Sequence, residues 1–173
     1  AAAEMTLALP DRPSLAVLPF ANIGNNPEQD YFADGIVEEL ITALSRMRSL
    51  FVIARNSSFT FKGKVADVKD VGRELGVRYV LEGSVRRSAS RLRITAQLVD
   101  AEKGTNLWAD RFEGALDDVF ELQDQITTCV IAAVSPQIEK AEIARAQRKT
   151  TESLDAYDVY LRGLAAYNQR TAE

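Results

Sequence analysis

Hydrophobic positions along the chain follow two different periods, and the alternation between them predicts the order of the elements. Residues 14–20 form a nearly all-apolar run, which is typical of a strand buried on both faces. From Asn26, a capping residue with Pro27 at the first helical position, apolar residues recur at helical spacing up to about Arg48. Residues 50–54 return to an unbroken apolar run and predict a second strand.

This strand–helix–strand order predicts two parallel strands joined by a right-handed crossover. A second helix follows, with Asp67 as its N-terminal cap and Gly76 as its stop. It leads into a third strand at residues 78–87.

Residues 78–87 and 92–100 alternate between apolar and polar side chains and predict an antiparallel hairpin with a loop at residues 88–91. A slip of one residue would turn the apolar side chains to the wrong face, so the register can be predicted. The favoured register pairs Leu81 with Leu98, Gly83 with Ala96 and Val85 with Ile94. A last strand is expected at residues 105–113, with Trp108 and Phe112 as core or sheet-covering residues.

From about residue 116 the pattern becomes helical again, and Pro136 is expected to kink or split this helix. The resulting fold class is α/β, in the order strand–helix–strand–helix–strand–strand–strand–helix. It contains a five-stranded mixed sheet, parallel at first and antiparallel at the end. A further amphipathic segment at residues 154–167 predicts a C-terminal helix.

Composition narrows the classes of function. The 173 residues carry a formal net charge of −4, whereas nucleic-acid-binding surfaces are basic, so no nucleic-acid partner is expected. The sequence has no histidine, and we expect neither a metal site nor a cofactor. Its single cysteine, Cys129, cannot form an internal disulfide, which suits a cytoplasmic location. The apolar stretch at residues 126–137 is shorter than the roughly 20 residues of a membrane span.

Several long strings in order resemble the TolB-like N-terminal domain family, over about residues 7–138. They are SLAVLPF, DYFADGIVEELITALSR, LFVIARNSSFTFKG, DVGRELGVRYVLEGSVRR, RITAQLVDAEKGTNLWADRF and DVFELQDQI. The leader LALPDRPSLAVLPF looks like the version that follows a class III adenylate/guanylate cyclase domain, and other relatives follow DNA-binding domains. SLDAYDVYLRGLAAYNQ is similar to the segment that opens a tetratricopeptide repeat region, although it lacks the Trp of a consensus repeat.

This resemblance implies a linker at residues 1–13, a TolB-like domain at 14–138, a helical linker at 139–152 and the start of a tetratricopeptide-like region at 153–173. It further implies a non-catalytic module that couples the repeat region to an upstream output domain. Its partners would be protein domains in the same or a partner chain, including a second copy in a homodimer. Two alternatives stay open, namely a small-molecule receptor domain and the effector domain of a transcription regulator.

Polar residues follow the first two predicted strands, at the edge where α/β sheets commonly bind ligands. Arg55 supplies charge there, and the residues able to complete hydrogen bonds to a polar or anionic ligand are Asn22, Asn56, Ser57 and Ser58. The same side chains can instead bond to the backbone and shape a loop. The loop-shaping interpretation is favoured, and the ligand-binding interpretation stays open.

A second candidate surface is the arginine-rich hairpin, where the predicted register sets Arg86 opposite Arg93, with Arg87 and Arg91 nearby. Like charges facing across a strand pair are destabilising, so a counter-charge is expected. It can come from Asp110 or Glu113 in the last strand, or from an acidic surface on another domain, and a simply solvated face is favoured over both.

Two further features have plain structural interpretations. Cys129 lies in the apolar phase of its helix, which predicts a buried and inert thiol. Asp34 and Glu38 are four residues apart, and an exposed helix face explains this pair better than a metal site.

Overall fold

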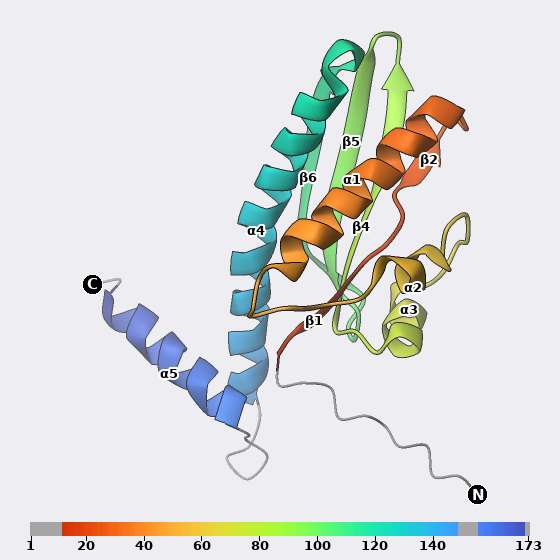
Figure 1. The fold of residues 1–173 in the computed structure, drawn as a ribbon. Coiled ribbons are helices and arrows are strands. Elements are labelled where there is room, and N and C mark those ends of the chain that lie inside the picture. Colours follow the sequence, from red (N-terminus) through yellow and green to blue (C-terminus); the bar gives the residue numbers. More distant parts are fainter. Residues whose placement is uncertain (1–11, 149–155, 172–173) are drawn as a thin grey trace, which may run out of the picture.

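The structure, a computed structural model, describes residues 12–148 and 156–171. These residues form an α/β domain around one mixed sheet with the strand order β3-β1-β4-β5-β6, and β2 also pairs with β4 (Figure 1). The strands are β1 (Ser14–Val17), β2 (Ala21–Ile23), β3 (Phe51–Val52), β4 (Tyr79–Ser88), β5 (Arg91–Asp100) and β6 (Thr105–Ala115). The helices are α1 (Pro27–Ser45), α2 (Arg55–Phe59), α3 (Val68–Leu75), α4 (Val119–Arg148) and α5 (Ala156–Thr171), with a 3-10 turn at Leu116–Asp118.

The parallel part of the sheet confirms the predicted parallel pairing, because β1 pairs in parallel with both β3 and β4. Asn26 caps α1 by accepting the Glu28 N–H, and Gly76 ends α3 in the left-handed conformation at φ 65°. The sequence did not predict β2. This strand has three residues, too few for an alternating pattern to appear, and it brings the sheet to six strands instead of five.

The antiparallel part confirms the predicted register of all three residue couples, including Val85 with Ile94. The turn is tighter than predicted, since Ser88 and Arg91 already pair and only two residues connect them. Ala89 in this turn has a φ of 54°, as a two-residue hairpin requires. The last strand reaches Ala115, two residues beyond its predicted end.

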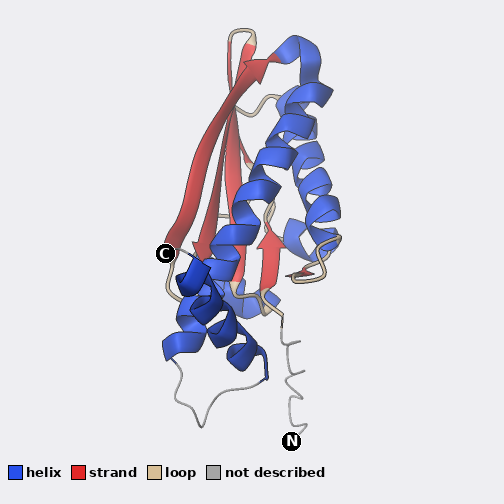
Figure 2. Ribbon diagram, turned by 90° about the vertical axis from the view of Figure 1, so that its left-hand side faces the viewer, coloured by secondary structure: helices blue, strands red, loops and turns tan. Residues whose placement is uncertain are grey.

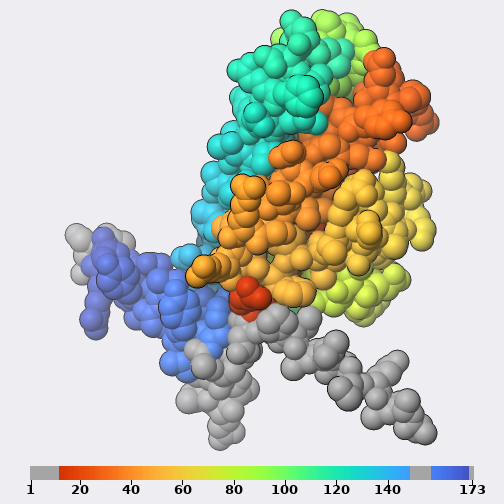
Figure 3. Space-filling view, in the orientation of Figure 1, coloured from red at the N-terminus to blue at the C-terminus, as the bar shows by residue number. Residues whose placement is uncertain are grey.

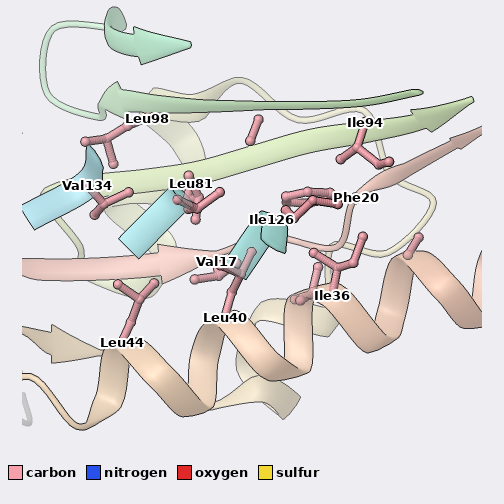
Figure 4. Packing of buried hydrophobic residues seen from close by; sticks show 14 of the residues in the cluster. Val17, Phe20, Ile36, Leu40, Leu44, Leu81, Ile94, Leu98, Ile126 and Val134 are labelled. Atoms are coloured by element: carbon pink, nitrogen blue, oxygen red, sulfur yellow. The ribbon is translucent and has the colours of Figure 1, made fainter. Parts of the chain in front are cut away.

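Helices α1 and α4 lie side by side on one face of the sheet and enclose the main core (Figures 2 and 3). Val17, Leu81 and Leu98 of the sheet point toward Ile36, Leu40 and Leu44 of α1 and toward Ile126 and Val134 of α4 (Figure 4). Trp108 and Phe112 pack against this core from β6, as predicted.

The opposite face of the sheet is only partly covered. The α2–α3 segment closes a smaller core over it, made of Ala16, Leu18, Val71, Val77, Val80 and Ala101. The remaining part, formed by β4, β5 and β6, carries exposed or half-exposed polar side chains, among them Arg86, Arg93 and Arg111. We call this part the open face.

Helix α4 runs unbroken for 30 residues, so Pro136 does not split it. The helix tolerates this proline because Pro136 lies on its solvent-facing side. Pro136 and Ala132 are exposed, so the carbonyl that loses its intrahelical bond lies on the solvent side of the helix. The buried stripe recurs every four residues at Leu122, Ile126, Val130, Val134 and Ile138, then continues through Glu142 and Ala146. Cys129 lies beside this stripe and is exposed, which corrects the prediction of a buried thiol.

The predicted helical linker therefore continues α4 as far as residue 148, and residues 149–152 lie outside the described residues, as do residues 1–11. Helix α5 packs on the C-terminal half of α4. At the same end of the molecule, Pro13 and Leu50 line a cavity of about 260 Å³ together with Ile138 and Leu161.

Candidate functional site at the junction of α4 and α5

The residues predicted to form a strand-end loop fold differently from the expectation. Arg55, Asn56, Ser57 and Ser58 all belong to the short helix α2, which begins directly after β3 with Ala54 as its extended N-cap residue. Ser58 is completely buried, while Asn56 and Ser57 are exposed. Each side chain therefore meets a different environment.

The Arg55 guanidinium has partners within the chain. It lies over the ring of Phe59, 3.9 Å from the ring centroid, and its Nε is 3.9 Å from a carboxylate oxygen of Glu38. Nearby, Lys62 donates to Asp34 at 2.5 Å and to Asp30 at 2.9 Å, which ties the segment after α2 to α1. The predicted carboxylate pair Asp34 and Glu38 thus faces two cations.

Asn22 does not share this end of the sheet. It lies in β2 beside Val85 of β4, whereas Val17, the last residue of β1, lies beside Leu81. Val85 is four positions beyond Leu81, about 13 Å along β4 at 3.3 Å per residue. The Asn22 amide donates to the Asn26 carbonyl at 2.8 Å. Ligand binding by the remaining group at α2 stays a prediction.

The arginine-rich hairpin has the predicted arrangement, with Arg86 opposite Arg93. The Arg93 Nε donates to Glu113 Oε1 at 2.8 Å, so β6 supplies one of the counter-charges considered from the sequence. Arg87 lies 3.7 Å from Glu28 and donates from its Nε to the Ala89 carbonyl. Arg91 is exposed at the turn. The use of this surface by a partner stays a prediction.

A cavity of about 770 Å³ lies where the open face meets the segment after α2. The open face contributes the hydrogen-bonded pairs Glu82 with Gln97 and Ser84 with Thr95, and residues 61–66 form the opposite wall. Sequence reasoning missed this cleft because its two walls are joined only by the tertiary fold.

The junction of α4 and α5 contains the most deeply buried charges. Glu142 of α4 is 1% exposed and accepts a hydrogen bond from Arg78, the residue just before β4. Burial raises the pKa of the Glu142 carboxyl above its ordinary value, and the Arg78 guanidinium opposes this rise. Burial also raises the pKa of Tyr157 in α5 to about 12, with Glu142 nearby.

Helix α5 adds its own polar contacts to this junction. Its Arg162 donates from Nε to the Ala146 carbonyl of α4 at 3.3 Å, and Asp158 is 1% exposed. Three parts of the chain, β4, α4 and α5, therefore meet around Glu142. No local pattern indicates this site, because residues 139–149 have the charged, Ala-rich composition of a solvated helix.

Within residues 12–148 and 156–171, no three His, Cys, Asp or Glu side chains come together in a way that could hold a metal ion. No helix in the same ranges is long and apolar enough to cross a membrane.

This arrangement is an α/β domain of the TolB type. TolB from Acinetobacter baumannii matches with a TM-score of 0.51 and 17% identity, over 72% of this chain and 29% of TolB. Lipoprotein GNA1162 from Neisseria meningitidis matches with a TM-score of 0.53 and 16% identity, over 72% of this chain and 99% of the lipoprotein. The TolB-like resemblance of the sequence is thereby supported at the level of the fold.

The chain belongs to the family described as "HilA/YgeH-like transcriptional regulator, second domain", whose model matches residues 11–129. A protein of Rhizobium meliloti (strain 1021) named "Putative adenylate cyclase 3" is 50% identical over 171 residues. That match covers 99% of this chain but 29% of the relative, so the chain spans less than a third of the relative's length. Both descriptions fit a regulatory module of a signalling protein.

Proposed function

We propose that this chain is a non-catalytic module of an adenylate cyclase-like signalling protein, and that it couples a C-terminal helical region to an output domain. The 50% identity to the R. meliloti relative supports the cyclase context. The relative's remaining length, outside the match, has room for the catalytic domain. Because a cyclase uses cytoplasmic nucleotides, the proposal places this chain in the cytoplasm.

The continuity of α4 is the observation that carries this proposal. Its first half supplies Ile126, Val130 and Val134 to the main core, and its second half holds α5. A helix of 30 residues is about 45 Å long and moves as one body over short distances. A displacement of α5 would therefore shift side chains inside the α/β core, which is the physical requirement for coupling.

The absence of catalysis is supported by ion pairs that engage several carboxylates within the chain. The carboxylates of Asp30, Asp34, Glu38 and Glu113 are each engaged by a cation of the same chain. A class III cyclase instead needs two metal-binding carboxylates facing a nucleotide pocket. The proposal therefore assigns turnover to a region outside the matched segment.

The coupling can be tested in a chimera in which this chain replaces the matching segment of the R. meliloti relative. We expect the chain alone to form no cyclic nucleotide from ATP with magnesium or manganese. In the chimera we expect cyclic AMP synthesis, and we expect deletion of all residues after 148 to change its rate. Cyclic AMP formation by the chain alone, or a rate insensitive to the deletion, would overturn the proposal.

The role of α4 has a matched pair of variants. Glu139→Gly with Lys140→Gly weakens the helix at two exposed positions by about 1 kcal/mol each, without changing its phase. This double variant should reproduce the effect of the deletion, whereas Glu139→Ala with Lys140→Ala should not. Equal rates for the two double variants would show that α4 is not the coupling element.

The family description supports a second candidate, the effector domain of a transcription regulator. In that case the chain would act on a DNA-binding domain instead of a cyclase. Fusion of the chain to a DNA-binding domain distinguishes the two. Promoter activity that depends on residues 156–171, together with a chimera insensitive to the deletion, would favour this candidate.

A further inference from the structure

Strand β6 forms a long edge of the sheet. It has 11 residues and is the last strand of the order, whereas β3 at the other edge has two. Among the described residues β6 pairs only with β5, so its outer row of backbone N–H and C=O groups faces away from the sheet. In Figure 2, which looks toward this edge, β6 climbs beside α4 to the top of the molecule. Such a row is a template for another strand.

The two arginines next to Glu113 on this part of the sheet contact its carboxylate at different distances. Arg93 donates to Oε1 of Glu113 at 2.8 Å, and the Arg111 guanidinium lies 3.9 Å from that same oxygen. Both contacts described for the carboxylate thus use Oε1, and Oε2 is left to accept from elsewhere. Arg111 is 61% exposed, and its side chain makes no closer ion pair among the described residues.

Symmetry limits how two copies can join at this edge. In an antiparallel strand pair, directly opposed residues point to the same face of the sheet. When a twofold axis perpendicular to the sheet relates the two strands, one residue must therefore lie opposite its own equivalent in the second copy, and the axis passes between these two residues. An axis at Asp110, Arg111 or Glu113 opposes that charge to itself, which is destabilising. An axis at Phe112 instead sets each Arg111 opposite the second copy's Glu113.

We propose that two copies of this chain pair edge to edge along antiparallel β6 strands, with the twofold axis at Phe112. One sheet then runs through both copies. Each Glu113 lies between its own Arg93 and the second copy's Arg111, and Ala109 lies opposite the second copy's Ala115 without steric conflict. Charge complementarity at this register identifies the occupant of the edge as a second copy. The inference does not depend on the proposed function.

Charge exchange between copies tests the register. Arg111→Glu sets two carboxylates opposite each other in a homodimer, and Glu113→Arg sets two guanidinium groups opposite each other. Mixed one to one, the two variants regain both opposite-charge pairs. By sedimentation we expect a concentration-dependent dimer for the unsubstituted chain. Each variant alone should show a dissociation constant raised about tenfold or more, and the mixture should recover.

Circular dichroism melting controls for folding, because both substitutions lie on exposed residues. Arg111→Glu should leave the monomer intact, whereas Glu113→Arg sets an arginine opposite Arg93 of the same chain and should lower the melting temperature without unfolding the chain. An unsubstituted chain that stays monomeric at its highest soluble concentration would overturn the proposal. So would folded single variants that dimerise as tightly as the unsubstituted chain, or a mixture that stays monomeric.

Cysteine crosslinking gives a second, geometric test in a Cys129→Ser background. Opposed residues of antiparallel strands have α-carbons about 4.5–5.5 Å apart, within the range of a disulfide. Ala109→Cys mixed with Ala115→Cys should therefore crosslink under mild oxidation. Each variant alone should not, since its two cysteines would lie about 20 Å apart along the strands. Crosslinking of either variant alone, or none in the mixture, would exclude this register.

Discussion

The α-carbon of Gly83 faces the ring of Phe20, so a Cβ at residue 83 would lie 2.8 Å from two ring carbons and 2.3 Å from the Thr95 carbonyl oxygen. The ring is buried and the carbonyl belongs to the β5 backbone, so neither can move aside freely. We expect Gly83→Ala to lower the free energy of unfolding by about 1–3 kcal/mol, measured by urea titration.

Gly163 in α5 provides the matched control, because a Cβ there meets nothing within 4 Å. Gly163→Ala should stabilise the chain by up to about 1 kcal/mol through helix propensity. Equal effects of the two substitutions would contradict the close approach of β4 to Phe20.

The two faces of the β4–β5 hairpin should respond differently to a new charge. Val85 is completely buried opposite Ile94, whereas Ser84 lies half-exposed on the open face. Val85→Asp should cost about 2 kcal/mol or more by burying an unpaired carboxylate, and Ser84→Asp should cost much less. Denaturant unfolding of both variants checks the assignment, which similar losses would contradict.

The buried pair of Arg78 and Glu142 should behave non-additively. Arg78→Met leaves a carboxylate that is 1% exposed without its cation, at a cost of about 3–5 kcal/mol near neutral pH. Arg78→Met combined with Glu142→Met should recover most of this loss, because two apolar side chains replace two charges. A double-mutant cycle of unfolding free energies measures the recovery, and strictly additive losses would argue against a direct pair.

The destabilisation caused by Arg78→Met should depend on pH. The pKa of Glu142 is raised by burial in the folded state, so the folded protein holds this proton more tightly than the unfolded chain. Its contribution is therefore fully present below the ordinary value of 4.5 and is lost as the pH rises through the folded pKa. Without Arg78 the pKa rises further, so the destabilisation by Arg78→Met should be smaller at acidic than at neutral pH. A loss that grows on acidification would refute this.

Arg55→Ala distinguishes the two interpretations of α2. The cation over the Phe59 ring is part-exposed, and we expect its loss to cost about 0.5–1 kcal/mol. A receptor site predicts something else, namely a polar or anionic compound that raises the melting temperature of the unsubstituted chain but not of the variant. A thermal-shift screen decides between them, with Arg46→Ala as the exposed control.

Much of the sheet could be predicted from the sequence because its signals are local. The register of β4 with β5 follows from alternation, since a slip of one residue would bury Arg86 or Thr95. The caps Asn26 and Asp67 were predictable for the same reason, because each bonds to the backbone two residues onward.

The remaining features depend on contacts between distant residues. Nothing near Glu142 in the sequence indicates burial, because its partner Arg78 is 64 positions away. Cys129 shared the apolar phase of α4, yet the helix buries a narrower stripe through Ile126 and Val130. The sequence groups Asn22 with Arg55 because both follow a predicted strand, but the chain continues as β2 and sets Asn22 beside Val85, about 13 Å along β4 from the partner of Val17.

The cavity shared by Pro13, Leu50, Ile138 and Leu161 has a consequence for how this domain sits in a longer polypeptide. Residue 13, before the first strand, and α5, after the last core helix, meet at one pole of the molecule, and the arginine-rich hairpin lies at the opposite pole (Figure 1). Segments joined before residue 13 and after α5 would therefore begin next to each other and could contact each other directly. The arginine-rich hairpin, at the other end of the domain, would then be available to a different partner.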